Sequence, residues 1–267
     1  MKDLKDAGYK YFAAETFAND SFFIKEKHPV FFTGFYTTEP QFGNLVREAI
    51  KLNFTLYPYE AIPTTNGKER EIGQAKNLQA LLKKDPNAKI IIYCGFSHIR
   101  EDSVPSWGKA MAGRLKEFTG IDPYTIEQII LSERSNKEAE DSYFKLIYSD
   151  TYSVLIDRNG APFKSLGVDA LLYSPPANYI YNRPNWVFEN NKVPYLLNAK
   201  NINLSFPIIA KAYLDTDNLK ETIPIDVIEI KSRDAVSGTA IALFDKGHFV
   251  IRLFDKIGKT QTFKVVK

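Results

Sequence analysis

Short apolar runs alternate with amphipathic helical patterns through the first 190 residues of the chain. Three of these runs end on ionisable side chains, namely Glu15, Glu60 and His98. Helical patterns occupy 38–50 and 66–82, where apolar residues recur at the spacing of one helix face. Strands that alternate with helices build a mainly parallel sheet with helices on both faces. We therefore expect an α/β fold.

Capping residues set the expected starts of these helices. Thr38 and Gln41 form a capping box around Pro40, and Asn66 with Glu69 marks the next helix start. We expect a third helix over 106–118 and further strands at 128–132, 152–156 and 169–173.

The pattern changes beyond about residue 190. Short strands with turn residues between them are expected there, and the last two form a hairpin. The expected strands are 227–230, 239–244, 248–254 and 260–266. We therefore expect an α/β domain over 1–190, a connecting segment over 191–215 and a small antiparallel β unit over 216–267.

Charge and cysteine content narrow the class of partner. A net charge of +3 over 267 residues, with basic and acidic residues interspersed, argues against nucleic acid and anionic membranes. The single cysteine, Cys94, excludes an internal disulfide, and its apolar run indicates a buried, inert thiol. No apolar run approaches the ~20 residues of a spanning helix. We expect a small-molecule or peptide substrate, with oligomeric state and compartment left open.

The strand ends are the candidate functional site. In open α/β sheets the ligand crevice lies outside the carboxyl ends of the strands, so Glu15, Glu60 and His98 are expected to share one site. Imidazole suits His98 to act as a general base or a metal ligand, and Gly95 before it permits close backbone approach. The aromatic loop after Glu15 is expected to exclude water and raise the pKa of this carboxyl. A helix-capping carboxylate and a hydrogen-bonded loop histidine would give the same pattern.

Further candidates flank these strand ends. Arg70 at a helix start is a candidate charge stabiliser for an anionic transition state. Glu71 beside it and Tyr59 beside Glu60 are candidate ligand-binding residues, as are Arg183 and Trp186. The alternatives are a solvated surface pair for Arg70 and a packing anchor for Trp186.

The helix and strand around His98 resemble a known superfamily. Arg70-Glu71, Ala75-Lys-Asn77 and the strand that ends in His98-Ile resemble the core of the erythromycin-esterase-like proteins. Gly95-x-x-His98 is similar to the second Gly-x-x-His motif of the Tiki/TraB proteins, and Gly8 to Glu15 matches a strand of the superfamily that starts with Gly and ends with Glu. The haem-uptake protein ChaN belongs to the same broad superfamily.

The resemblance covers roughly residues 1–190 and implies an activity. It implies a metal-assisted or His/Glu-dependent hydrolase of an ester or amide bond. Glu15 and His98 would be its acid–base groups or the ligands of a divalent metal, with Arg70 as a further site residue. The ChaN member implies an alternative, a non-catalytic binder of haem or another small ligand held by the aromatic residues at 17–36.

The first residues suggest that more chain lies upstream. Residues 1–8 lack the apolar core of a signal peptide and indicate the last turns of a helix that Gly8 stops. We expect a strand and most of a helix before them, including the Gly-Glu-x-x-His segment that the resemblance implies. A signal for the cell envelope or secretion, if the protein has one, would lie there too, so the compartment stays open. The chain as given would then bind a ligand with little turnover.

Overall fold

The computed structural model describes residues 1–17, 28–61, 66–216, 218–219 and 221–267. Contacts divide the chain into two compact units. The first comprises 1–19 and 53–176, and the second comprises 20–52 and 177–267. This division differs from the expected domains, because a helix from the first fifty residues packs with the C-terminal strands.

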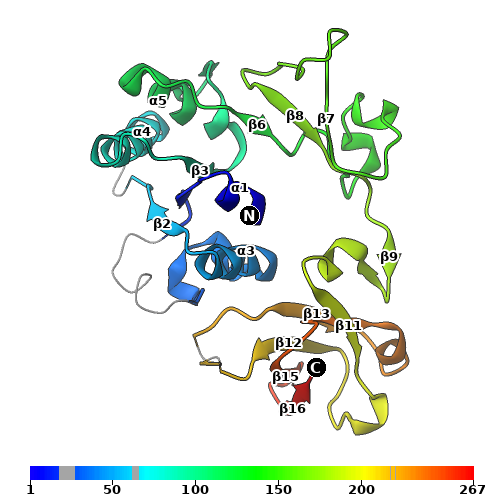
Figure 1. Ribbon diagram of the computed structural model, residues 1–267. Helices are drawn as coiled ribbons and strands as arrows, with labels where there is room; N and C mark the ends of the chain where they lie inside the picture. The colour runs from blue at the N-terminus through cyan, green and yellow to red at the C-terminus, as the bar shows by residue number, and fades with distance from the viewer. Residues whose placement is uncertain (18–27, 62–65, 217, 220) are drawn as a thin grey trace. The chain divides into compact units, whose positions relative to one another are not determined.

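The first unit is built on a parallel sheet, as the alternating pattern predicts. The strand β1 (Tyr11–Ala14) lies between β2 (Thr55–Pro58) and β3 (Ile90–Tyr93), and both neighbours run parallel to it (Figure 1). All residues of β1, the central strand, are buried. In the register, Ala14 lies opposite Pro58 and opposite Tyr93. The residues that follow the strands therefore emerge at one edge of the sheet.

Helices α4 (Gly67–Lys84) and α5 (Met111–Thr119) pack against each other and against this sheet. The side chain of Asn66 accepts a hydrogen bond from the Glu69 amide, which confirms the predicted start of α4. The shared core comprises Ala13, Tyr59, Ala75, Leu78, Met111 and Leu115. A short helix α1 (Lys2–Asp6) precedes β1, and Gly8 after it has φ +87°.

The third predicted helix begins later than expected. Residues 106–110 are not helical, because a small hairpin of β4 (Ser103–Val104) and β5 (Gly108–Lys109) turns there. Gly108 has φ +68°, a conformation that favours glycine and ends the turn without a helix.

Two of the strands predicted after α5, those over 152–156 and 169–173, lie in a separate sheet. Its order is β6 (Ile126–Glu127), β8 (Ala170–Tyr173) and β7 (Ser153–Val154), with β6 parallel and β7 antiparallel to β8. The prediction of a strand over 128–132 is wrong. The Glu127 carboxylate accepts hydrogen bonds from the amides of Ile129 and Ile130, so the chain turns there and does not continue β6. Short 3-10 helices complete the unit: η3 (Phe96–Ile99), η4 (Lys137–Ala139) and η5 (Phe144–Leu146).

The second unit contains the predicted antiparallel sheet. Its order is β13 (Asp226–Ile230), β12 (Ile208–Leu214), β15 (His248–Asp255) and β16 (Thr260–Val266), and the β15–β16 hairpin is confirmed. A second pair joins β11 (Lys192–Leu196) to β14 (Ala240–Phe244). The strands β11 and β12 lie in the segment 191–215 that was expected to be a connection. β11 pairs with β14, and β12 pairs with β15 as well as with the next strand, β13. Pairings with strands as distant as β14 and β15 are not visible in the local pattern.

Helix α3 (Pro40–Lys51) also belongs to the second unit. Arg47 and Asn44 donate hydrogen bonds to the backbone carbonyls of Ile223 and Ile225, at 2.6 and 2.9 Å. The helix is capped by the Glu39 side chain, which accepts the Phe42 amide, and the predicted Thr38 capping box is wrong. Thr38 itself ends a 3-10 helix. The remaining elements are η1 (Phe31–Thr33), η2 (Tyr36–Thr38), β9 (Tyr179–Ile180), β10 (Arg183–Pro184), η6 (Asn185–Phe188), η7 (Ala199–Asn201) and η8 (Asp234–Gly238).

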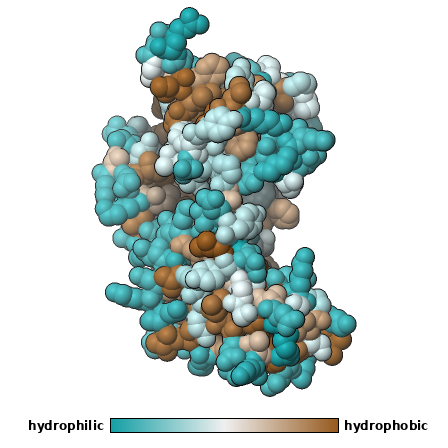
Figure 2. Space-filling model, turned by 90° about the vertical axis from the view of Figure 1, so that its right-hand side faces the viewer, coloured by the Kyte–Doolittle hydropathy of each residue, from teal (hydrophilic) through white to brown (hydrophobic). Residues whose placement is uncertain are grey.

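The described helices carry no membrane-spanning signal. None of them is both long enough and apolar enough to cross a bilayer. On the face drawn in Figure 2, hydrophilic and hydrophobic residues are interspersed.

Candidate functional site

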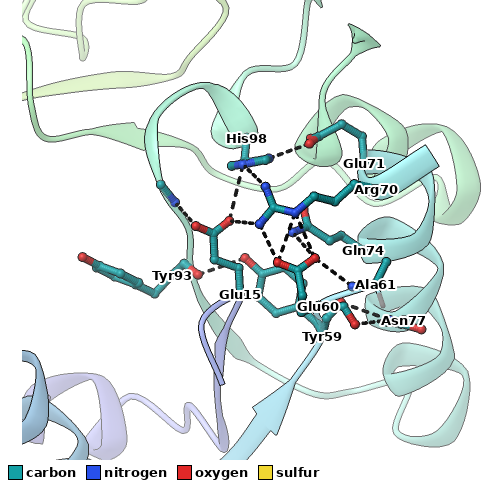
Figure 3. Close-up of polar contacts among 11 residues, drawn as sticks. Glu15, Tyr59, Glu60, Ala61, Arg70, Glu71, Gln74, Asn77, Tyr93 and His98 are labelled. Atoms are coloured by element: carbon teal, nitrogen blue, oxygen red, sulfur yellow. Dashed lines mark hydrogen bonds and ion pairs between the residues drawn. The ribbon is translucent and has the colours of Figure 1, made fainter. Parts of the chain in front are cut away.

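Four predicted site residues meet at the carboxyl edge of the parallel sheet (Figure 3). Glu15 follows β1, Glu60 follows β2, and His98 follows β3 within η3. Arg70, in the first turn of α4, lies between them. The matched register of the three strands brings Glu15, Glu60 and His98, which are 38 to 83 positions apart in the sequence, into one cluster.

Arg70 is the centre of this cluster. Its guanidinium binds both carboxylate oxygens of Glu60, with Nε 3.0 Å from Oε1 and 3.1 Å from Oε2. Its Nη1 lies 3.1 Å from His98 Nε2, and its Nη2 lies 3.5 Å from Glu15 Oε2. The Arg70 side chain is 32% exposed, whereas those of Glu15 and His98 are 3% and 6% exposed. Arg70 is therefore the member of this charged group that solvent or a ligand reaches most readily.

One polar stripe of α4 holds the end of β2 in place. Gln74 donates to Glu60 Oε1 at 3.0 Å, and Asn77 donates to the carbonyls of Tyr59 and Glu60 at 3.0 and 3.2 Å. Together with Arg70, these residues follow the i, i+4, i+7 spacing of one helix face. Gln74 was not predicted from the sequence, although its position four residues after Arg70 on the same helix was a usable signal.

His98 is oriented by the buried carboxylate of Glu71. Nδ1 lies 2.7 Å from Glu71 Oε1, and the other oxygen of Glu71 accepts the Met111 amide at 2.7 Å (Figure 3). Arginine has only donors, so the contact between Arg70 and Nε2 requires a lone pair on Nε2. In the neutral ring the proton is then on Nδ1, the nitrogen that lies 2.7 Å from Glu71 Oε1. Glu71, which was predicted to bind ligand, contacts the histidine ring.

Trp107 covers the ring of His98. The two rings are stacked, with centroids 4.8 Å apart and planes 15° apart. Trp107 lies in the turn of the β4–β5 hairpin, where the sequence analysis expected a helix. No sequence signal placed it near His98.

Glu15 is nearly buried and is held by the backbone after β3. The Gly95 amide donates to its Oε1 at 3.1 Å, which is the close approach predicted for this glycine. Burial raises the pKa of Glu15, while the nearby His98 and Arg70 and the Gly95 amide oppose that shift. Glu15 therefore holds a proton more readily than an exposed carboxyl.

Replacing Glu15 with glutamine is expected to make the first unit relatively more stable as the pH rises. The folded pKa of Glu15 is raised above its ordinary value of 4.5, so the stability that this residue contributes is fully present below the unfolded pKa. It is lost as the pH rises through the folded pKa, and glutamine has no such loss. The free energy of unfolding of E15Q minus that of wild type should therefore increase from about pH 4 towards neutral.

This difference can be measured by urea unfolding at a series of pH values. Trp107 fluorescence in a Trp186→Phe background reports on the first unit, since the chain has two tryptophans. Glu138→Gln at an exposed position is the matched control. A difference between E15Q and wild type that stays constant or falls over this range would contradict the buried state of Glu15.

Three other predicted site residues lie outside the cluster's polar contacts with Arg70. Tyr59 is fully buried, donates to the Tyr93 carbonyl at 2.9 Å, and has its pKa raised well above the ordinary value by burial. Arg183 and Trp186 belong to the second unit. Arg183 is buried in an ion pair with Asp226, and Trp186 is 42% exposed.

The donor set does not fit a metal ion. Glu15 Oε2 and His98 Nε2 are 3.5 Å apart, but the cationic guanidinium of Arg70 contacts both. In the described ranges no group of three or more His, Cys, Asp or Glu residues could hold a metal ion.

Cys94 and the described residues of the aromatic loop lie outside the polar contacts of Arg70. Residues 18–27, with Phe22 and Phe23, lie outside the described residues, and the described part from 28 onwards belongs to the second unit. There Phe32 and Phe35 are exposed. Cys94 is partly buried, and burial raises the pKa of its thiol, which keeps it in the unreactive protonated form.

Comparison of the chain with protein families, with curated proteins and with solved structures gives no match. The cluster of Glu15, Glu60, Arg70 and His98 is therefore the basis for assigning a function.

Proposed function

We propose that the first unit is a His/Glu-dependent hydrolase of an ester or amide bond. The observation that carries the proposal is the Glu71–His98 pair, in which a buried carboxylate contacts Nδ1 and leaves the lone pair of Nε2 on the side of Arg70. A histidine oriented in this way by a third group is the usual arrangement of a general base. The partly exposed guanidinium beside it supplies positive charge where an oxyanion would form.

In the proposed reaction, the guanidinium of Arg70 turns from Nε2 of His98 to the substrate carbonyl oxygen, which frees the Nε2 lone pair. Nε2 then takes a proton from water, and the water oxygen bonds to the carbonyl carbon. The carbonyl π electrons move to oxygen, and Arg70 stabilises the resulting oxyanion. The bond to the leaving group then breaks, and His98 returns its proton to that group. Glu71 stabilises the imidazolium that exists between the two proton transfers, and Glu15, 3.5 Å from Nε2, is its acid–base partner.

We also propose distant membership of the erythromycin-esterase-like, ChaN and Tiki/TraB superfamily. Three motif residues support this: Glu15 at the end of β1, Asn77 on α4 and His98 after β3. Such membership implies helices on both faces of the parallel sheet, of which α4 and α5 supply one.

The test is a panel of p-nitrophenyl esters and p-nitroanilides assayed with the wild-type chain and with Glu71→Gln. The glutamine oxygen can still accept the Met111 amide, which turns its NH2 group towards Nδ1. The ring proton must then move to Nε2, where no lone pair remains to accept a proton from water. We expect kcat to fall about a hundredfold, the scale of general acid–base catalysis.

Glu69→Gln is the matched control, because it makes the same change at an exposed position two residues away. It should retain the wild-type rate. Equal rates for E71Q and E69Q would contradict the proposal. A haem absorbance band that appears with haemin and is lost in His98→Ala, without hydrolysis of any substrate, would favour the binding alternative.

A further inference from the structure

Trp107 is held in place from two sides. The Trp107 amide donates to the Val104 carbonyl at 3.1 Å. The Arg114 side chain, from α5, donates to the Trp107 carbonyl at 3.2 Å. These bonds fix the hairpin turn that carries the indole. Its ring then lies against His98, stacked at 4.8 Å.

The first residue of α4 leaves room for this indole. A Cβ at Gly67 would lie 2.5 Å from Cδ1 and 2.6 Å from Nε1 of Trp107, closer than side chains tolerate. Glycine is a poorer helix former than alanine. Local helix stability therefore does not explain Gly67, whereas the close approach of Trp107 does.

The stack and the Glu71 contact restrain the imidazole in different ways. The contact from Nδ1 to Glu71 is a single 2.7 Å interaction, about which the ring can still tilt. A face-to-face contact with planes 15° apart removes that tilt. With both restraints, the ring plane is fixed and the lone pair of Nε2 points in a single direction.

We infer that Trp107 is a positioning residue of the proposed reaction, which sets the plane of the His98 ring and excludes water from one face of it. The inference rests on the proposed hydrolase function. The indole face also attracts the imidazolium that forms during the reaction, because an aromatic face carries negative charge density. Gly67 takes part by admitting the indole to this position.

The test compares Gly67→Ala, Trp107→Leu and Trp107→Phe with Lys68→Ala as control. Gly67→Ala displaces the indole and leaves every cluster side chain unchanged, and Lys68 is exposed in the same turn. We expect kcat to fall about tenfold or more in G67A and W107L with KM unchanged, since small misplacements of a catalytic group have effects of this size. W107F retains an aromatic face and should recover most of the rate.

A spectroscopic readout separates the stack from turnover. In wild type the stacked indole should shift the carbon-bound ring protons of His98 upfield, and the chain has only three histidines to resolve. The shift should disappear in G67A and W107L and persist in K68A. The rate at which diethyl pyrocarbonate modifies His98, followed by mass spectrometry, should rise in the same two variants relative to His248.

The outcomes are distinct. If no substrate is hydrolysed but the shift and the modification rate change as described, the proposed function fails and the restraint of His98 by Trp107 stands. If G67A and W107L leave the shift and the modification rate unchanged, the inference is overturned whatever the turnover. If both readouts change while kcat stays at the wild-type value, Trp107 holds the ring without positioning it for the reaction, and the inference is overturned as well.

Discussion

Replacing His98 with alanine is expected to lower the rate of hydrolysis by a factor of about a hundred to ten thousand, the range of general acid–base catalysis. The variant removes the only ring nitrogen in the cluster that can accept a proton from water, and it leaves Glu71 and Arg70 without their contact on that side. The effect should appear in kcat, measured with whichever ester or amide the wild-type chain hydrolyses best.

The matched control is His248→Ala. His248 is the first residue of β15 in the second unit, is exposed, and should tolerate the change without loss of rate. Far-ultraviolet circular dichroism should show that both variants keep their secondary structure. Robust turnover by His98→Ala would show that His98 is not the general base, even if the variant keeps its secondary structure.

The cluster was predictable because its members follow strands in sequence. Glu15, Glu60 and His98 each end a short apolar run, and parallel strands place such ends at one edge. Arg70 was predictable from its place in the first turn of the next helix. Their roles were less accessible, because Glu71 and His98 are 27 positions apart and no pattern specifies which atoms meet.

Tertiary contacts determined what the sequence did not reveal. Residues 106–110 were predicted to form the first turn of the third helix. In the structure this helix begins at Met111. The Val104–Trp107 turn and Gly108, with its positive φ, occupy the preceding residues. The stack of Trp107 on His98 depends on that turn, so it was missed with it. In the second unit, β12 pairs both with β13, the next strand, and with β15, which lies further along the chain. A single strand of seven residues gives no sign of partners at that distance.

Arg183 shows why a charged residue near aromatic residues is a weak sign of a binding site. It was expected to line a pocket with Trp186, but its guanidinium binds both oxygens of Asp226, 43 positions away, at 2.9 and 2.8 Å. Arg183 is 6% and Asp226 1% exposed, and the carboxylate also accepts the Ala242 amide at 2.7 Å. The pair therefore joins β10, β13 and β14 within the second unit.

Arg183→Met is expected to destabilise the second unit by about 3–5 kcal/mol, the effect of breaking a buried ion pair by removing one partner. Methionine fills part of the volume but leaves the Asp226 carboxylate buried without its cation. Asp226→Asn in the same chain should recover part of the loss, because the neutral amide still accepts from Ala242 and carries no unpaired charge. Urea unfolding followed by Trp186 fluorescence in a Trp107→Phe background measures both.

Arg252→Met on β15 is the control for this experiment. Arg252 is partly exposed and its cationic group lies 5.1 Å from the centre of the Phe254 ring, an interaction of about 0.5–1 kcal/mol at such sites. Its loss should therefore be several times smaller than that of Arg183→Met. Equal losses in the two variants would mean that Asp226 is solvated or reorganises without Arg183. A double variant no more stable than Arg183→Met would show that lost packing of the arginine chain, and not the unpaired carboxylate, dominates.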